Sequence, residues 1–240
     1  MERPTGERCA PDGQAPRRPT RHTEDIAVTA RTPDFITFTG VDDLTSIEEM
    51  AALSARYPIE WGVLFDPLKQ GESPRFPSVA ALERVAASGL RLAAHLCGDH
   101  IASVRDDRAP ATPVPLDAFA RVQLNSHKLR TEDAVRFSRT IRKRCILPCS
   151  GPQFPRSDNL DWLYDPSGGR GRTVVSWPPH PGRLAGYAGG IGPDNVANVI
   201  AAIDAGGAYW IDMETGVRTA EIFDLALCEA VCRAAFGPST

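Results

Sequence analysis

The stretch over residues 160–216 constrains the fold more than any other part of the chain, because small-residue turns follow three predicted strands within it. These strands end near Asp165, Tyr187 and Met213. The residues of the three turns are Gly168, Gly169 and Gly171, then Gly189, Gly190 and Gly192, and finally Thr215 and Gly216. Turns of this kind at this spacing are typical of α/β folds in which the loops after several strands face one ligand.

The same turns predict a phosphate site. Glycine has no side chain, so backbone N–H groups beside it can approach a ligand closely. Pro193 suits the first turn of a helix, whose N-terminus would direct free N–H groups at an anion. In eight-stranded barrels a phosphate commonly lies between the turns after the seventh and eighth strands. The alternative is that these turns only end their strands.

Strand patterns alternate with helix patterns along the chain. The predicted strands cover residues 35–39, 61–65, 90–96, 120–124, 144–148, 161–164, 184–187 and 209–213. The main predicted helices cover residues 46–56, 78–87, 131–142, 193–205 and 220–235. The segment between the fifth and sixth strands is short and contains two prolines, so that connection is predicted to be irregular. The pattern predicts a single (β/α)8 TIM barrel over residues 34–240.

Composition restricts the remaining possibilities. Residues 1–33 are rich in proline and arginine and poor in apolar clusters, which predicts a disordered tail. A net charge of −3 gives no long-range attraction to nucleic acid, and no apolar run is long enough to span a membrane. The six cysteines fall mostly in predicted strands and helices, which indicates reduced thiols and a cytoplasmic location. We expect a soluble monomer or homodimer that needs no metal or cofactor.

Several motifs resemble those of one enzyme family, phosphoribosylanthranilate isomerase of tryptophan biosynthesis. They are Asp165 with Gly168, Gly169 and Gly171, the segment over residues 188–196, and the segment over residues 211–217. Ser73, Pro74 and Arg75 match a further family motif in a longer loop, and the strand before Asn125 matches a family strand that ends in histidine. The resemblance covers residues 35–236 and implies an acid/base Amadori rearrangement of a phosphoribosyl amine.

The resemblance also implies catalytic residues. Asp165 matches the family's general acid, and a turn-capping aspartate is the alternative. The family's base is a cysteine, and Thr39 stands in its place. A threonine hydroxyl does not ionise near neutral pH, so Thr39 is expected to hold a water or a substrate hydroxyl. Asp66 is the candidate replacement, and the other groups considered at the same rim are His95, Cys97 and Glu214.

Substrate-binding residues follow from the same motifs. Arg75 matches the arginine that binds the substrate carboxylate, and a solvated loop arginine is the alternative. Glu214 replaces a small serine beside the phosphate turn, where it would repel a phosphate unless Arg170 or Arg218 compensates. The full predicted substrate-binding set is Arg75, Asn125, Gly168, Gly169, Gly171, Gly189, Gly190, Glu214, Thr215 and Gly216.

The predicted function is therefore that of an enzyme, an aldose–ketose isomerase acting on a small phosphorylated substrate. Two other hypotheses stay open at this stage. One is an enzyme that acts on another phosphosugar or related anion on the same barrel. The other is a non-catalytic protein that binds phosphorylated metabolites, which the missing cysteine base favours.

Overall fold

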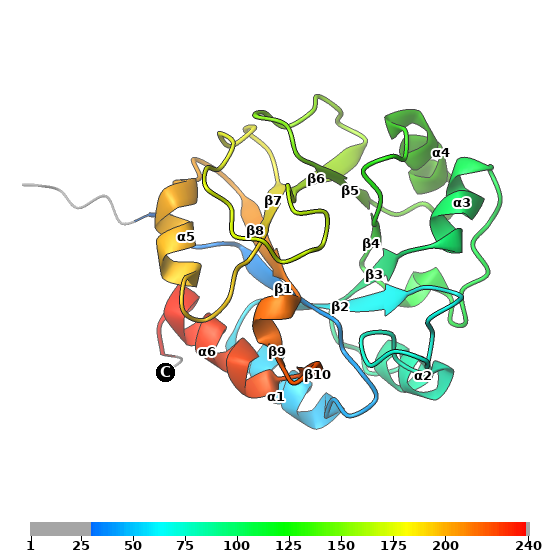
Figure 1. The fold of residues 1–240 in the computed structure, drawn as a ribbon, viewed down its shortest axis with the longest axis horizontal. Coiled ribbons are helices and arrows are strands. Elements are labelled where there is room, and N and C mark those ends of the chain that lie inside the picture. Colours follow the sequence, from blue (N-terminus) through cyan, green and yellow to red (C-terminus); the bar gives the residue numbers. More distant parts are fainter. Residues whose placement is uncertain (1–29, 239–240) are drawn as a thin grey trace, which may run out of the picture.

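The computed structural model describes residues 30–238, which form a closed barrel of eight parallel strands (Figure 1). Each strand pairs with the next in the chain, and β1 also pairs with β8, which closes the barrel. The strands are β1 Phe35–Thr39, β2 Ile59–Phe65, β3 Leu92–Leu96, β4 Arg121–Leu124, β5 Cys145–Cys149, β6 Leu160–Tyr164, β7 Ala185–Ala188 and β8 Tyr209–Met213. The predicted (β/α)8 barrel is confirmed. Residues 1–29 of the predicted tail lie outside the described residues.

Helices follow six of the eight strands and surround most of the barrel (Figure 1). The α-helices are α1 Ile47–Arg56, α2 Val79–Ala86, α3 Asp99–Arg105, α4 Thr131–Ile141, α5 Val196–Ile203 and α6 Leu225–Phe236. Two 3₁₀ turns, η1 Leu116–Ala118 and η2 Thr215–Val217, precede β4 and follow β8. The connection after β5 contains no helix, as predicted. The connection after β6 contains none either, so loops cover that side of the barrel.

Local capping explains where several helices begin. The Ser46 hydroxyl accepts a hydrogen bond from the Glu49 N–H, and the Ser78 hydroxyl accepts one from the Ala81 N–H. Both serines therefore satisfy amides that the first helical turn leaves free. Each helix then buries an apolar face against the barrel, with Met50 in α1 fully covered.

The last helix was predicted to begin at Ala220, and this starting residue was wrong. Residues 218–223 form a short antiparallel hairpin, β9 Arg218–Thr219 and β10 Ile222–Phe223. Its turn residues Ala220 and Glu221 have φ angles of 49° and 65°. Helix α6 begins only at Leu225, where Asp224 caps the amides of Ala226 and Leu227.

The predicted start of the helix after β7 at Pro193 was also too early, since α5 begins at Val196. Asn195 has a φ of −131°, which is not helical. Its side chain instead holds the preceding turn, because Oδ1 accepts from the Gly192 N–H at 2.9 Å and Nδ2 donates to the Gly190 carbonyl at 2.8 Å. This turn ends before the first helical residue.

The barrel interior is largely polar, although the layer between strands and helices is apolar. Successive side chains of a strand point to opposite faces, so Phe35, Thr37 and Thr39 share one face of β1. An apolar cluster inside the barrel contains Phe35, Ile146, Leu163, Ala188 and Trp210. The buried polar residues on the corresponding inward positions are Thr37, Thr39, Glu60, His95, Arg121, Gln123, Asp161 and Asp212.

Glu60, Arg121 and Asp161 lie near the N-terminal ends of their strands, and we call them the charged floor of the barrel. Arg121 donates to both carboxylate oxygens of Glu60, and its other terminal nitrogen lies 3.8 Å from Asp161 Oδ2. The Arg121 guanidinium stacks 4.2 Å from the Trp210 ring, and Arg91 also donates to Glu60. These ion pairs and hydrogen bonds offset the unfavourable free energy of burying charged groups.

None of the helices over residues 30–238 has the length and apolar character needed to cross a bilayer. The five cysteines in this part of the chain are free.

Candidate active site

A cavity of about 390 Å³ opens at the C-terminal ends of the strands. Active sites in barrels of this kind form at that end, from the loops after the strands. Nearly all the predicted site residues line it, namely Thr39, Arg75, Asn125, Asp165, Gly168, Gly169, Gly171, Gly189, Gly190, Glu214, Thr215 and Gly216. Asp66 is the exception, as it is not part of the cavity wall.

Asp66 lies at the end of β2 and organises the loop that follows. Its side-chain oxygen Oδ1 accepts a hydrogen bond from the Leu68 N–H, and Oδ2 lies 3.5 Å from Lys69 Nζ. The residue is buried beside Gly98. These contacts give Asp66 a turn-stabilising position and no direct access to a ligand in the cavity.

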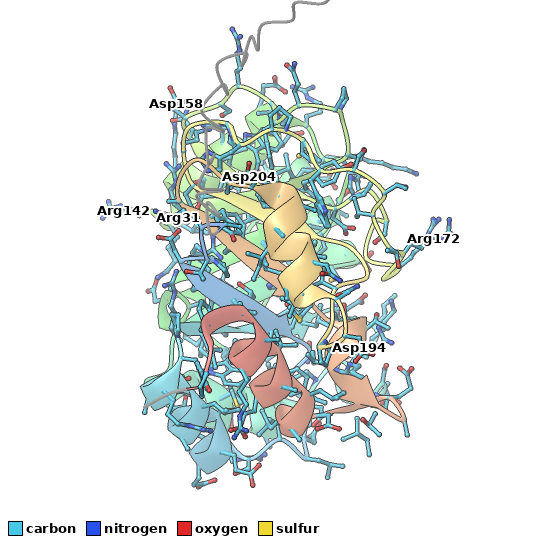
Figure 2. All side chains as sticks on the ribbon, turned by 90° about the vertical axis from the view of Figure 1, so that its left-hand side faces the viewer. Arg31, Arg142, Asp158, Arg172, Asp194 and Asp204 are labelled. Atoms are coloured by element: carbon cyan, nitrogen blue, oxygen red, sulfur yellow. The ribbon has the colours of Figure 1, made fainter. Side chains whose placement is uncertain are left out.

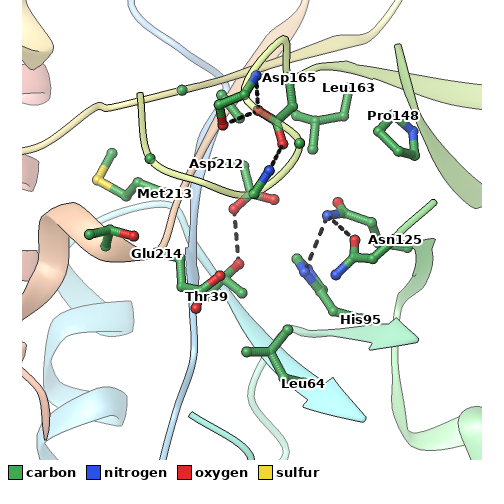
Figure 3. A pocket seen from close by; sticks show the side chains of 18 of the residues that line it. Thr39, Leu64, His95, Asn125, Pro148, Leu163, Asp165, Asp212, Met213 and Glu214 are labelled. Atoms are coloured by element: carbon green, nitrogen blue, oxygen red, sulfur yellow. Dashed lines mark hydrogen bonds between the residues drawn. The ribbon is translucent and has the colours of Figure 1, made fainter. Parts of the chain in front are cut away.

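Asp212 is the site residue that the motif comparison missed. It lies near the C-terminal end of β8, is buried, and lines the cavity beside Thr39 of β1. Thr39 Oγ1 donates to Asp212 Oδ1 at 2.9 Å, as Figure 3 shows. The other oxygen, Oδ2, has no hydrogen-bond partner among the described residues. A charged residue inside a buried strand was the available signal.

The environment of Asp212 shifts its ionisation. Burial raises the pKa of the Asp212 carboxyl to about 7, and the hydrogen bond from Thr39 opposes part of that rise. The carboxyl therefore exchanges a proton near neutral pH, which is the property that a general acid or base requires. Thr39 contacts this group directly, even though its own hydroxyl does not ionise.

His95 lies across the cavity from Asp212 (Figure 3), and Gln123 is its neighbour in the cavity wall. Gln123 Nε2 lies 3.2 Å from His95 Nδ1, which leaves His95 Nε2 to carry the imidazole proton. Burial lowers the pKa of His95 to about 3, so the ring is neutral at physiological pH. Both His95 Nε2 and Gln123 Oε1 lack hydrogen-bond partners in the described part of the chain.

Gly62 keeps the space between Thr39 and His95 open. A Cβ at this position would lie 2.3 Å from Thr39 Oγ1 and 3.0 Å from His95 Nε2. Both distances are shorter than ordinary contacts, so a larger residue would force one group to move. The deep end of the cavity thus presents a carboxyl, an imidazole N–H and an amide oxygen to any ligand that reaches it.

Asn125 and Cys97 form the upper part of the same wall. Gln123 Nε2 donates to Asn125 Oδ1 at 2.9 Å, and Asn125 Nδ2 contacts Cys97 Sγ at 3.2 Å. Burial raises the pKa of the Cys97 thiol to about 11. Cys97 is therefore a thiol near neutral pH, and the geometry does not support it as the missing base.

Asp165 lies above Asp212 in Figure 3, at the start of the loop after β6. Its Oδ1 accepts from the Ser167 N–H at 3.0 Å and from the Ser167 hydroxyl at 2.7 Å, while Oδ2 accepts from the Gly169 N–H at 2.7 Å. The turn-capping role considered from the sequence is therefore present. Asp165 also lines the cavity, so its position at the rim suits contact with a ligand.

The turns after β7 and β8 contact each other and present backbone N–H groups. A Cβ at Gly216 would lie only 2.0 Å from the Ile191 carbonyl oxygen, so the two turns require glycine there. Over residues 30–238, the N–H groups of Gly189, Gly190 and Ile191 have no hydrogen-bond acceptor. Free N–H groups that converge beside a helix start suit an anion.

Gly190 has a second role that the sequence did not reveal. A Cβ at this position would lie 2.6 Å from the Thr173 N atom, in the long loop after β6. The φ of Gly190 is also 62°, which disfavours other residues. Any larger residue at position 190 would therefore displace this loop as well as a bound anion.

Two arginines of the same loop lie outside the cavity wall. The side chains of Arg170 and Arg172 form no ion pair or hydrogen bond with the described residues. Figure 2 shows Arg172 extending away from the chain, at the same end of the molecule as Asp194, which precedes α5.

Glu214 forms its ion pair with Arg75, which was not one of the arginines considered from the sequence. Of those two, Arg218 acts on Glu214 without a direct contact: burial lowers the pKa of Arg218, and the charge of Glu214 opposes that shift. Arg75 NH1 donates to Glu214 Oε1 at 2.7 Å, and Arg75 Nε and NH2 contact Glu221 Oε2 at 3.0 and 2.9 Å. Arg218 donates instead to the backbone carbonyls of Gly40 and Glu221. The arginine predicted to bind a substrate carboxylate thus already binds two carboxylates of the chain.

Comparison with protein-family models and with curated proteins found no match to this chain. Solved structures do match. N-(5'-phosphoribosyl)anthranilate isomerase from Pyrococcus furiosus gives a TM-score of 0.55 at 15% identity, over 84% of this chain and 98% of that chain. The enzyme from Thermococcus kodakaraensis gives 0.55 at 13% identity, over 85% and 100%. A phosphoribosyl anthranilate isomerase in complex with reduced 1-(o-carboxyphenylamino)-1-deoxyribulose 5-phosphate gives 0.56 at 13% identity, over 85% and 98%. The chain therefore shares the barrel fold of phosphoribosylanthranilate isomerases.

Proposed function

We propose that this chain is an acid/base isomerase that converts a phosphoribosyl amine to the corresponding aminoketose phosphate, and that Asp212 is its base. The observation that carries this proposal is the free Oδ2 atom of Asp212, which belongs to a buried carboxyl that titrates near pH 7 in the cavity wall. Buried polar atoms without partners are unfavourable, and a sugar hydroxyl or carbonyl in the cavity would satisfy them.

The chemistry divides between the two aspartates. Asp165, at the rim, would protonate the ring oxygen as the bond from that oxygen to C1 breaks and the lone pair of the amine nitrogen forms a C1=N bond. Asp212 would then remove the proton from C2, and its electron pair forms a C1=C2 bond while the C1=N electrons return to nitrogen. The resulting enol becomes the ketone when C1 gains a proton and the C2 hydroxyl loses its own. The neutral His95 N–H is suited to stabilise negative charge on the C2 oxygen, because it donates a hydrogen bond without carrying charge.

The far end of the substrate would occupy the glycine turns. The free amides of Gly189, Gly190 and Ile191 are suited to a dianionic phosphate. Such binding places the sugar between the anion site and the deep polar atoms. We infer that the phosphate fixes the orientation of the sugar, while Asp212, Thr39 and His95 contact its reacting carbons and oxygens.

The test uses aryl amines of ribose 5-phosphate, prepared with aniline or with anthranilate, and follows formation of the ketose product. We expect Asp212→Asn to reduce turnover by about a thousandfold or more, in the range for loss of a general base together with its charge. The amide cannot accept the C2 proton, which explains the loss of turnover. It fills the same space as the carboxyl, so binding of the phosphorylated ligand should change by less than about threefold. Asp133→Asn, a buried aspartate of α4 outside the cavity, is the matched control and should retain wild-type turnover.

Retention of full turnover by Asp212→Asn would exclude the proposed base. If no aryl amine is turned over, a thermal-shift screen with phosphorylated sugars separates a binding protein from an enzyme with a different reaction. The ion pair between Arg75 and Glu214 favours a second candidate, a phosphosugar enzyme whose substrate is not phosphoribosylanthranilate. Complementation of a tryptophan auxotroph distinguishes the two candidates.

A further inference from the structure

Arg75, Glu214 and Glu221 form a cluster at the cavity opening that joins the loop after β2 to the segment after β8. The Arg75 and Glu214 side chains are 26% and 22% exposed, whereas that of Glu221 is 66% exposed. Arg75 and Glu214 line the cavity, and Glu221 does not. Glu214 therefore covers the face of the guanidinium that a ligand would reach, and Glu221 covers the face toward solvent.

Among the described residues, the long basic side chains of the cavity wall are already paired with carboxylates. Arg75 and Lys69 are the basic residues with long side chains in the cavity wall, and each already contacts a carboxylate. The nearby Arg218 is buried, donates to two backbone carbonyls, and lies 3.8 Å from Asp42 Oδ2. Arg75 is therefore held between two glutamates, where the loop after β2 meets the segment after β8.

We propose that Glu214 determines specificity by excluding substrates that carry a carboxylate at the end away from the phosphate. This inference rests on the proposed function and narrows its substrate to phosphoribosyl amines with an uncharged or cationic substituent. A carboxylate would have to displace Glu214 from Arg75, which would leave a partly buried glutamate without its partner. Otherwise it would lie beside two like charges, and either outcome disfavours binding.

Two probes that differ by a single carboxylate test the inference. They are reduced 1-(o-carboxyphenylamino)-1-deoxyribulose 5-phosphate and its phenylamino counterpart, and isothermal titration gives the ratio of their dissociation constants. We expect the wild-type protein to bind the phenylamino compound at least about tenfold more tightly. Glu214→Gln should reduce this preference by at least about tenfold, because the amide releases Arg75 to the carboxylate.

Glu221→Gln is the matched control, since it removes the same charge from the same arginine on the solvent side. We expect it to change the ratio by less than about threefold, because exposed charges are screened. Equal or tighter binding of the carboxyphenyl compound by the wild-type protein would overturn the specificity role while leaving the isomerase proposal intact. An unchanged ratio in Glu214→Gln would do the same. Failure of both compounds to bind would overturn the phosphosugar site itself.

Discussion

The role proposed for Asp212 predicts a pH dependence of turnover with a defined direction. If this carboxyl is the base, it must be ionised, so kcat/KM of the free enzyme should fall about tenfold per pH unit below a midpoint near 7 and level off above it. The measurement is a pH profile of kcat/KM with a phosphoribosyl amine. A profile that rises toward acid pH would show that Asp212 acts in its protonated form.

Thr39 should set the position of that midpoint. Its hydrogen bond to Asp212 favours the ionised carboxylate and lowers the pKa of the group. Thr39→Val removes the donor at nearly constant volume, so the midpoint should move to higher pH by up to about one unit. Thr39→Ser retains the hydroxyl and should keep the wild-type midpoint. Identical profiles for the two variants would rule out this role.

The same ionisation should affect stability. The folded pKa of Asp212 is about 7 and its ordinary value is 3.8, so the folded state retains a proton that the unfolded chain releases between these pH values. The free energy of unfolding is therefore lowered as pH rises from 4 to 7, by at most about 4 kcal/mol. Urea unfolding of Asp212→Asn and wild type at pH 4 and pH 8 tests this. The variant should gain stability relative to wild type at pH 8, and an equal difference at both values would contradict the assignment.

At the scale of elements, the charged floor connects β2, β4 and β6 at the end of the barrel opposite the site. Arg121→Met should leave Glu60 with only Arg91 and Thr37 as partners, and we expect a loss of about 3 kcal/mol in the free energy of unfolding. Glu60→Gln combined with Arg121→Met removes the uncompensated charge and should recover part of that loss. Urea unfolding of the single and double variants measures the coupling, and additive losses would show that the two residues act independently.

Elements with local signals could be predicted from the sequence. The eight strands and the capped helices α1 and α2 are examples, since apolar patterns and the serines Ser46 and Ser78 act locally. The β9–β10 hairpin could not be predicted, because its turn uses Ala220 and Glu221 at positive φ, where glycine or asparagine is usual. Tertiary contacts decide such a turn.

The site was predictable in its location and not in its chemistry. The glycine turns after β7 and β8 identified the end of the barrel where the cavity opens. Asp212 was read only as part of a buried strand, since its significance depends on Thr39, which lies 173 residues away in the chain. The ion pair between Arg75 and Glu214 likewise joins distant segments of the chain. Residue types alone do not reveal that Glu214 occupies the guanidinium that would otherwise bind a substrate carboxylate.

For the whole molecule, the first 29 residues should be dispensable for stability, because their composition offers few apolar side chains to bury. A chain that begins at Ala30 retains Arg31, whose carbonyl accepts a hydrogen bond from the Tyr209 hydroxyl. We expect its free energy of unfolding to lie within about 0.5 kcal/mol of that of the full chain. Chemical denaturation of both chains measures the difference, and a loss of several kcal/mol would show that the first residues contact the barrel.

Closure of the barrel between β1 and β8 has a consequence for synthesis of the protein. At roughly 5 to 20 residues per second, the 173 residues from Gly40 to Asp212 take on the order of 10 to 35 s to translate. Throughout that time β1 has no partner on one edge, and unpaired edges favour aggregation. The hydrogen bond between Thr39 and Asp212 spans this last joint, so the reacting groups meet only when the final strand is in place. A nascent chain that stalls before β8 would therefore lack both Asp212 and the turn that follows this strand.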